Sequence, residues 1–384
     1  MSERGVAEKR PEVMMLGLRG IPDVQGGVEK HVEELSRQFV EKGWDVEVIG
    51  RKPYLPHSAP YMWKDIRVLP LWAPRSMKFE AIVHTALGVF VAAWRRPDIL
   101  HIHAIGPALM TPLARLLGLK VVVTHHGFDY HRQKWNRFAR TVLKLGESAG
   151  MRFADRRIAV SNDIARTMEK RYGVPVRFVP NGVSVRRGVS DTGILEKFGL
   201  APRRYVILVA RIVPEKRQLD LIAAFARLND PSLKLVLVGS AEHTASYAQE
   251  VEKLAEKTPG AVLAGMQTGD DLACLFGNAR LFVLPSSHEG MPIALLEAMG
   301  YGLPVLASDI TANLEIGLPP EDYFPLGNVD ELASALRRKL AEPFSEKEAS
   351  ARASHIEKAY GWPSIAGRTL QVYEETAGGP PKRR

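Results

Sequence analysis

The sequence has one cysteine in 384 residues, Cys274, which lies in an apolar stretch. A single cysteine can form neither an internal disulfide nor a thiolate metal site, so we expect Cys274 to be a small buried residue of a hydrophobic core. A chain that forms no disulfide fits a reducing compartment, and we therefore predict a cytoplasmic protein.

Long apolar segments are missing as well. The first ten residues are polar, and the apolar run at residues 13–18 is too short for the core of a signal peptide. The longest apolar stretch, residues 79–94, is interrupted by Glu80 and His84. It falls short of the roughly 20 residues that a membrane-spanning helix needs, so we expect a buried helix there.

Acidic residues are fewer than basic ones: 43 Asp and Glu stand against 52 Lys and Arg, and the formal net charge is +9. Such a charge is compatible with nucleic acid, an anionic membrane surface or acidic ligands as partners. The basic residues do not alternate with aromatic residues as they do in proteins that bind single-stranded nucleic acid. We therefore predict that nucleic acid is not a partner.

One basic segment, residues 131–145, fits two interpretations. With Trp135, Phe138 and Leu143 it has the pattern of a cationic amphipathic helix, which can lie on an anionic bilayer. It also fits an ordinary surface helix whose apolar stripe faces the core. Peripheral binding to the inner face of the cytoplasmic membrane stays open beside a purely cytoplasmic location.

Apolar, β-branched runs alternate with helical patterns along the chain, which predicts parallel sheets covered by helices on both faces. The alternation pauses at residues 181–202, a stretch rich in glycine and polar residues. We predict an α/β protein with two doubly wound, Rossmann-like domains, residues 11–182 and 183–362. The expected strands are 13–18, 46–49, 99–103, 120–124 and 157–160 in the first domain, and 205–209, 234–238, 262–264, 281–284 and 305–307 in the second.

Ligands of such sheets bind outside the carboxyl ends of the strands, and two facing sheets would place the active site in the cleft between the domains. The first motif at a strand end is the glycine-rich loop 17–27, which precedes a helix near Val28. Gly26 and Gly27 before a helix N-terminus let backbone N–H groups approach an anion. The motif is neither a Walker loop nor GxGxxG, and a plain turn is the alternative interpretation.

The second motif, Thr-His-His-Gly-Phe-Asp-Tyr at residues 124–130, also follows a strand. His125, His126 and Asp129 are metal-ligand residue types. However, neighbouring residues of a strand point to opposite sides of the sheet, so His125 and His126 would not share a ligand. We predict that this protein has no metal site.

The third motif contains Arg211 and Lys216, between a strand and a helix. Two cations at that position suit a diphosphate, because arginine offers a fork of donors and lysine a point charge. Taken alone, the motif also fits solvated surface cations.

The fourth motif is the most informative and contains Glu289 and Glu297. The pattern predicts a helix that begins near Pro292, so that Glu297 lies just over one turn into it. Free backbone N–H groups at this N-terminus, expected from Met291, Ile293 and Ala294, suit a phosphate. Of the two carboxylates, one suits sugar hydroxyls and the other a ribose diol, since both accept hydrogen bonds well.

Taken together, the motifs resemble the group 1 retaining glycosyltransferases of the GT-B fold, over about residues 13 to 375. The spacing of Glu289 and Glu297 within Glu-Gly-Met-Pro-Ile-Ala-Leu-Leu-Glu-Ala-Met is the hallmark of that family. The other matches are Gly26-Gly-Val-Glu-Lys-His-Val, Val179-Pro-Asn-Gly-Val, the pair Arg211 and Lys216, Gly302-Leu-Pro-Val, and Gly361-Trp-Pro-Ser-Ile-Ala. The combination is specific, whereas each motif alone is not.

The resemblance implies residue roles. Glu289 would contact the donor sugar, Glu297 the ribose, and His126 would lie beside the transferred sugar. Gly27 would let the first loop reach the phosphate. The implied catalytic residues are His126, Glu289, Arg211 and Lys216, and the implied donor-binding residues are Gly26, Gly27, Arg211, Lys216, Gly239, Glu289, Gly290, Met291, Ile293, Ala294 and Glu297.

The resemblance also implies the reaction and its partners. A nucleotide-diphosphate sugar would be the donor substrate, a saccharide or lipid-linked molecule the acceptor, and no cofactor or metal would take part. The first domain would bind the acceptor and the second the donor, with a last helix at about 363–376 packing back on the first. The N-terminal motif resembles bacterial enzymes of exopolysaccharide or lipopolysaccharide synthesis.

Two other functions stay open: a nucleotide-sugar epimerase of the same fold, and a non-catalytic binding relative. The presence of Glu289, Glu297, Arg211 and Lys216 argues against a relative that has lost its activity.

Overall fold

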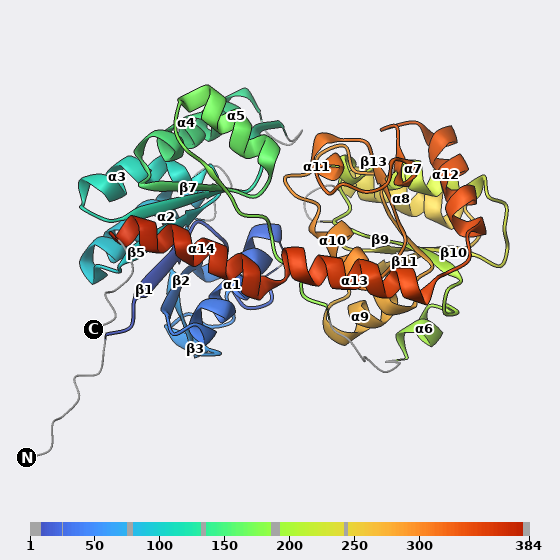
Figure 1. The fold of residues 1–384 in the computed structure, drawn as a ribbon, viewed down its shortest axis with the longest axis horizontal. Coiled ribbons are helices and arrows are strands. Elements are labelled where there is room, and N and C mark those ends of the chain that lie inside the picture. The colour runs from blue at the N-terminus through green and yellow to red at the C-terminus, as the bar shows by residue number, and fades with distance from the viewer. Residues whose placement is uncertain are drawn as a thin grey trace, which may run out of the picture. The chain divides into compact units, whose positions relative to one another are not determined.

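The computed structural model describes residues 9–24, 26–74, 80–131, 136–185, 193–241 and 245–378. The chain divides into two compact units. Unit 1 comprises Met1–Gly182 and Trp362–Arg384, and unit 2 comprises Val183–Gly361. In each unit helices cover both faces of a central sheet (Figure 1).

The sheet of unit 1 has eight strands in the order β3-β4-β2-β1-β5-β6-β7-β8. All neighbours are parallel except β3 and β4. Its central strands are apolar and buried on both faces, as a covered parallel sheet requires. The strands are β1 (Glu12–Leu16), β2 (Asp45–Arg51), β3 (Tyr61–Trp63), β4 (Ile66–Leu71), β5 (Ile99–His103), β6 (Val121–His125), β7 (Arg156–Ala159) and β8 (Arg177–Phe178).

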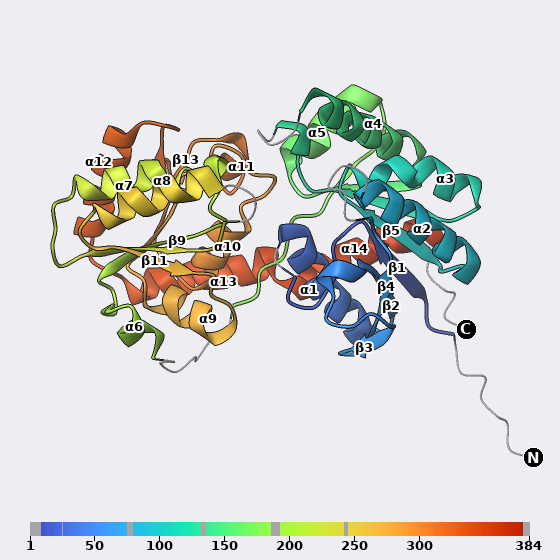
Figure 2. The same ribbon diagram turned by 180° about the vertical axis from the view of Figure 1, so that it is seen from behind.

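Two helices distant in sequence, α1 (Gly27–Glu41) and α14 (Trp362–Ala377), pack together on one face of this sheet. Helices α2 (Glu80–Arg95), α3 (Thr111–Leu116) and α4 (Arg137–Phe153) form a contacting series on the other face, and α5 (Asn162–Tyr172) packs against α4 (Figures 1 and 2). The ring of Tyr373 on α14 contacts Phe39 and Trp44, and its hydroxyl lies 2.6 Å from Nδ1 of His101. These contacts fix the last helix to unit 1.

The sheet of unit 2 has six parallel strands in the order β11-β10-β9-β12-β13-β14. The strands are β9 (Tyr205–Val209), β10 (Lys234–Val238), β11 (Ala261–Gly265), β12 (Leu281–Leu284), β13 (Val305–Ser308) and β14 (Tyr323–Phe324). One face carries α7 (Gln218–Ala226), α8 (Ala245–Glu256) and α12 (Val329–Ala341), and the other carries α9 (Gly269–Asn278), α10 (Ile293–Gly300) and α13 (Glu346–Tyr360) (Figure 2). Two short helices, α6 (Ile194–Lys197) and α11 (Thr311–Leu314), complete the unit.

The structure confirms the alternation of strands and helices and the buried position of Cys274 on α9. Four strands were not predicted from the sequence: β3, β4, β8 and β14. These strands are two to six residues long and lie at or near the sheet edges, where no long apolar run marks them. Within the described residues, no helix is long and apolar enough to cross a membrane.

Two expectations about helices of unit 1 were wrong in part. Residues 79–94 were expected to form a buried helix, but Phe90 and Trp94 on α2 are 55% and 82% exposed. In the segment 131–145 the helix α4 begins only at Arg137, after Asn136, whose side chain accepts a hydrogen bond from the Ala139 N–H at 2.9 Å. Residues 132–135 lie outside the described residues.

A buried carboxylate anchors α4. The side chain of Glu147 is fully buried and accepts hydrogen bonds from the Tyr172 hydroxyl at 2.8 Å and from the Arg171 guanidinium at 2.7 Å, and its other oxygen lies 3.3 Å from Nε2 of His125. Burial alone would raise the pKa of Glu147, but the hydrogen bonds of His125 and Tyr172 lower the pKa to about 2. The ionised form therefore stabilises the folded state.

We predict that Glu147→Gln lowers the free energy of unfolding at neutral pH by about 3 kcal/mol, because the pKa lies some two to three units below the usual 4.5. Since the folded-state pKa is depressed, this contribution is complete above the unfolded-state pKa and is lost as the pH falls towards the folded-state value. The gap between wild type and variant should therefore narrow between about pH 4.5 and pH 2.

Urea unfolding at a series of pH values measures this gap. The control is Glu374→Gln, because Glu374 is exposed on α14. If the difference in unfolding free energy between wild type and Glu147→Gln were equal at neutral and acidic pH, the role assigned to the charge would be contradicted.

Candidate active site

The carboxyl ends of three neighbouring strands of unit 2 carry most of the residues singled out from the sequence. Strand β9 lies between β10 and β12. The loop after β12 is tied to the loop after β9, because the N–H of Ser287 donates to the Glu215 carbonyl at 2.8 Å and the Ser287 hydroxyl lies 3.3 Å from the same oxygen. Parallel strands thus bring two loops together that lie about 70 residues apart in the sequence.

An ion pair joins these loops. Lys216 donates through Nζ to Oε1 of Glu289. The two side chains are only 18% and 10% exposed, so for Lys216 the interpretation as a solvated surface cation was wrong. A cation and a carboxylate are therefore held side by side at the end of the sheet, each oriented by the other.

The backbone at Arg211 is fixed by a buried glutamine. Gln218 donates through Nε2 to the Arg211 carbonyl at 2.8 Å, and its Oε1 accepts from the Tyr247 hydroxyl at 3.1 Å. The N–H of the next residue, Ile212, donates to the Ser240 carbonyl at 3.0 Å. Gln218 and Tyr247, which orient this loop from α7 and α8, were not predicted from the sequence.

Gly239 directly follows β10 and has a φ of +147°, in a region that favours glycine. A Cβ atom at this position would lie 1.9 Å from the Ala210 carbonyl oxygen, so a side chain would push the two loops apart. Its N–H donates to the Gly265 carbonyl at 2.8 Å. The glycine thus allows the loop after β10 to lie against the loop that carries Arg211.

Helix α10 presents one partly exposed face, formed by Ile293, Ala294 and Glu297, whereas its remaining side chains from Leu295 to Gly300 are buried. The helix begins directly after Pro292, as the sequence predicted. The N–H of Ile293 donates to the Met291 carbonyl at 3.0 Å. The expectation that this N–H is free for a ligand was therefore wrong, because the turn before the helix closes on itself.

The glycine-rich loop lies in unit 1. Helix α1 begins at Gly27, and a Cβ atom on Gly26, with φ of +151°, would lie 2.0 Å from Oε2 of Glu29. Oε1 of Glu29 accepts from the backbone N–H of Arg19 at 3.1 Å and from its Nε at 3.2 Å. A carboxylate of the chain itself thus lies at the first turn of this helix, close to Gly26.

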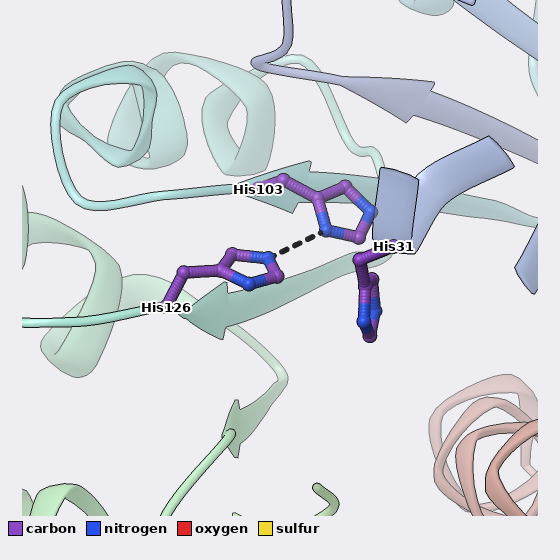
Figure 3. Close-up of side chains that lie close together, drawn as sticks. All are labelled: His31, His103 and His126. Atoms are coloured by element: carbon purple, nitrogen blue, oxygen red, sulfur yellow. Dashed lines mark hydrogen bonds between the residues drawn. The ribbon is translucent and has the colours of Figure 1, made fainter. Parts of the chain in front are cut away.

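His126 belongs to a cluster of histidines in unit 1, drawn in Figure 3. His31 comes from α1, His103 from the end of β5, and His126 directly follows β6. Nδ1 of His103 lies 3.1 Å from Nε2 of His126, and the ring of His31 meets that of His126 edge to face at 5.0 Å. As predicted, His125 points elsewhere, towards Glu147. His31 and His103 were not predicted from the sequence, although a His-x-His pair at the end of β5 was a usable signal.

The cluster could hold a metal ion by its spacing, since ligand atoms of the three side chains lie within 4.8 Å of one another. Burial lowers the pKa of each histidine, that of His31 to about 4, so the rings are neutral, which is the form that binds a metal. Imidazole ligands suit zinc. However, the contact between His103 and His126 is a hydrogen bond and uses one nitrogen of each ring.

The candidate residues therefore fall into two groups. Unit 2 brings Arg211, Lys216, Gly239, Glu289 and the start of α10 to one edge of its sheet. Unit 1 holds Gly26, Gly27 and His126. The predicted cleft between the two domains stays a prediction.

Two family models match the chain. Residues 25–187 match Glycosyltransferase Family 4, and residues 194–360 match Glycosyl transferases group 1. The second match contains every candidate residue of unit 2. The chain belongs to the group 1 glycosyltransferases.

Similar proteins agree with this membership. The chain is 26% identical over 369 residues to the phosphatidyl-myo-inositol mannosyltransferase of Mycolicibacterium smegmatis, covering 93% of this chain and 92% of that protein. It is 29% identical over 259 residues to an Escherichia coli UDP-Gal:alpha-D-GlcNAc-diphosphoundecaprenol alpha-1,3-galactosyltransferase, covering 63% and 66%.

Solved structures give the fold of this glycosyltransferase. Sucrose-phosphate synthase from Thermosynechococcus elongatus matches with a TM-score of 0.81 and 21% identity, covering 95% of this chain and 99% of that one. HepE from Anabaena, in complex with UDP and glucose, matches with a TM-score of 0.76 and 18% identity, covering 95% and 100%. The two Rossmann-like domains are those of the GT-B fold, as the sequence predicted.

Proposed function

We propose that the protein transfers a sugar from a nucleoside diphosphate sugar to a saccharide or lipid-linked acceptor, with retention of configuration and without a metal ion. The observation that carries this proposal is the ion pair of Lys216 with Glu289 at the carboxyl ends of β9 and β12. A nucleotide sugar offers the complementary groups, since its anionic diphosphate adjoins a sugar with several hydroxyls.

In this proposal unit 2 binds the donor. Arg211 and Lys216 neutralise the diphosphate, and Glu289 accepts hydrogen bonds from the transferred sugar. Glu297, on the exposed face of α10, accepts them from the ribose. The backbone N–H groups of Gly290 and Ala294 bind the phosphate together with the positive end of the helix dipole, whereas the N–H of Ile293 is engaged with the Met291 carbonyl. Gly239 keeps the neighbouring loop free of a side chain.

Unit 1 binds the acceptor in this proposal. Gly26 and Gly27 let the backbone at the start of α1 approach the donor phosphate, and His126 lies beside the transferred sugar. The carboxylate of Glu29, close to Gly26, is balanced by Arg19, so a phosphate nearby would not meet an unpaired negative charge.

The proposed reaction is a displacement on one face of the sugar. The bond between the anomeric carbon and the diphosphate oxygen breaks, the acceptor oxygen bonds to that carbon from the same side, and the acceptor proton passes to the departing diphosphate. Charge accumulates on the leaving group in the transition state. Cations and backbone dipoles that are already oriented stabilise this charge most, because they need no rearrangement.

The names of similar proteins support the acceptor class and a role in cell-surface polysaccharide synthesis. One relative is named for a diphosphoundecaprenol-linked acceptor, and another, from Bacillus subtilis, for putative teichuronic acid biosynthesis. We propose a lipid-diphosphate-linked saccharide as the acceptor. The nucleotide base and the sugar of the donor are to be found by experiment.

A turnover assay tests the proposed function. The protein is incubated with a panel of nucleoside diphosphate sugars, with and without undecaprenyl-diphosphate saccharides, in the presence of EDTA, and released nucleoside diphosphate is measured. We expect acceptor-dependent release from one donor, with turnover unaffected by EDTA. Loss of turnover in EDTA that manganese or magnesium restores would overturn metal independence. A product with inverted anomeric configuration would overturn retention. A product in which the sugar is epimerised and not transferred would overturn the transferase reaction.

We predict that substitutions of the two glutamates have different effects on nucleoside diphosphate binding and on turnover. Glu297→Gln should weaken nucleoside diphosphate binding and raise the donor KM, because the ribose is held equally before and during the reaction. Glu289→Gln should lower kcat and leave nucleoside diphosphate affinity unchanged or higher, since the diphosphate carries no sugar and the variant frees Lys216 from its carboxylate partner.

Calorimetric titration of the nucleoside diphosphate into both variants measures this difference without an acceptor. Glu256→Gln serves as a control, because Glu256 is exposed on α8 of the same unit. Weaker binding in Glu289→Gln together with unchanged binding in Glu297→Gln would reverse the assignment.

We further propose that α4 binds an anionic membrane surface. Phe138 and Leu145 on this helix are 65% and 56% exposed, and the basic side chains of Arg137, Arg140 and Lys144 are also exposed. The alternative, an apolar stripe that faces the core, does not describe these two residues. The adjoining helices α3 and α2 add exposed apolar side chains to the same layer, namely Leu116, Phe90 and Trp94.

We predict salt-sensitive binding to vesicles that contain anionic phospholipid, because each basic side chain near such a surface contributes about 1 kcal/mol and salt screens it. The double variant Phe138→Ser/Leu145→Ser should bind less in a sedimentation assay. The control Leu326→Ser changes an exposed leucine of unit 2 and should bind normally. Equal binding to neutral and anionic vesicles, or none at low salt, would count against this surface.

A further inference from the structure

His103 is a buried histidine whose two ring nitrogens meet chemically different partners. Nε2 lies 3.4 Å from Sδ of Met15 on β1, and Nδ1 lies 3.1 Å from Nε2 of His126. Figure 3 shows the second contact as a dashed line between the rings. Both His103 and Met15 are fully buried, so water does not compete for the contact between them.

The thioether decides which nitrogen of His103 carries the proton. A thioether sulfur has no hydrogen and can only accept, so Nε2 of His103 must be the donor in this contact. Burial, together with the nearby rings of His101, His126 and His31, lowers the pKa of His103 well below its usual range. The ring is therefore neutral, with one N–H, and its Nδ1 is an acceptor.

The tautomer of His103 determines that of His126. Because Nδ1 of His103 accepts, Nε2 of His126 must donate its hydrogen to it. Burial and the rings of neighbouring histidines also lower the pKa of His126 well below its usual range, so this ring too has a single N–H. Nδ1 of His126 is then left with a free lone pair, on the ring edge that points away from His103 (Figure 3).

The neighbouring groups do not change which nitrogens of His103 and His126 carry the protons. The ring of His101 is tilted against that of His103, with centroids 3.9 Å apart. Its nitrogens are engaged with the Tyr373 hydroxyl at 2.6 Å and the Thr124 hydroxyl at 2.7 Å. His31 meets the His126 ring edge to face. Since the His126 side chain is only partly buried, its Nδ1 edge is the part of this network that a ligand can reach.

We propose that Met15 and His103 are positioning residues that hold the proton of His126 on Nε2, so that Nδ1 accepts a hydrogen bond from a hydroxyl of the bound saccharide. The identity of that hydroxyl rests on the proposed function, but the tautomer is a property of the protein alone. With the opposite tautomer His126 would present an N–H donor at the same place. Met15 thus determines that His126 presents an acceptor rather than a donor at this place.

Nitrogen NMR of protein labelled with ¹⁵N-histidine tests the tautomer directly. Protonated and unprotonated ring nitrogens have well-separated chemical shifts, and single substitutions of His103 and His126 assign their signals. We expect a protonated Nε2 and an unprotonated Nδ1 for both residues. A protonated Nδ1 on His126 in the wild-type protein would overturn the proposal.

Met15→Leu tests the origin of the tautomer, because it removes the sulfur acceptor and conserves volume. The matched control is Met14→Leu, the same change at the next residue of β1, which is also fully buried. We expect Met15→Leu to yield mixed tautomers of His103 and His126, and Met14→Leu to leave both spectra unchanged. Unchanged His126 signals in Met15→Leu would contradict the role of the thioether.

Kinetics then separate this inference from the proposed function. If the protein transfers sugar, Met15→Leu should lower kcat about threefold to tenfold, the usual effect of one weakened hydrogen bond, without changing nucleoside diphosphate affinity. A loss of that affinity would mean a general structural defect and would overturn the positioning role. If the expected tautomers are observed but no donor is turned over, the proposed function fails and the tautomer assignment stands.

Discussion

The ion pair between Lys216 and Glu289 is the interaction on which the account of unit 2 depends. It joins the loops after β9 and β12, which are neighbours in a parallel sheet. Both side chains are largely buried, so removal of either partner would leave a poorly solvated charge. Without a ligand the two charges compensate each other, and an incoming diphosphate would offer Lys216 a second anionic partner.

The surrounding backbone keeps this pair at the end of the sheet. Gln218 holds the carbonyl of Arg211, Ser287 bonds to Glu215, and Gly239 allows the third loop to lie close. Gln218, Ser287 and Gly239 carry no charge, and their contacts are with backbone atoms of the neighbouring loops. These contacts orient the charged groups before the substrate binds, and electrostatic stabilisation of a transition state requires such preorganisation.

Much of this could be predicted from sequence, because the signals are local. The alternating apolar runs predicted both sheets, and the spacing of Glu289 and Glu297 around Pro292 predicted a helix start with a carboxylate on either side. The pairing of Lys216 with Glu289 could not be predicted, since it depends on the order of strands in the sheet. The same holds for His31 and His103, which reach His126 from α1 and β5.

The prediction of a free N–H at Ile293 was wrong for another reason. The turn before α10 engages this N–H with the Met291 carbonyl, and residue types do not reveal the geometry of that turn. Exposure was equally hard to judge. The patterns of α2 and α4 suit a helix against a core, yet Trp94 and Phe138 lie on the surface, and the buried sides of both helices consist mainly of small or polar residues.

The central claim is that the carboxyl edge of the sheet in unit 2 binds a nucleotide sugar. A crystal structure with the preferred nucleoside diphosphate sugar bound tests it most directly. The account predicts the diphosphate at Arg211, Lys216 and the start of α10, the ribose at Glu297, and the ion pair between Lys216 and Glu289 opened so that the carboxylate contacts the sugar. A ligand bound elsewhere, or an intact ion pair with the diphosphate away from both cations, would contradict it.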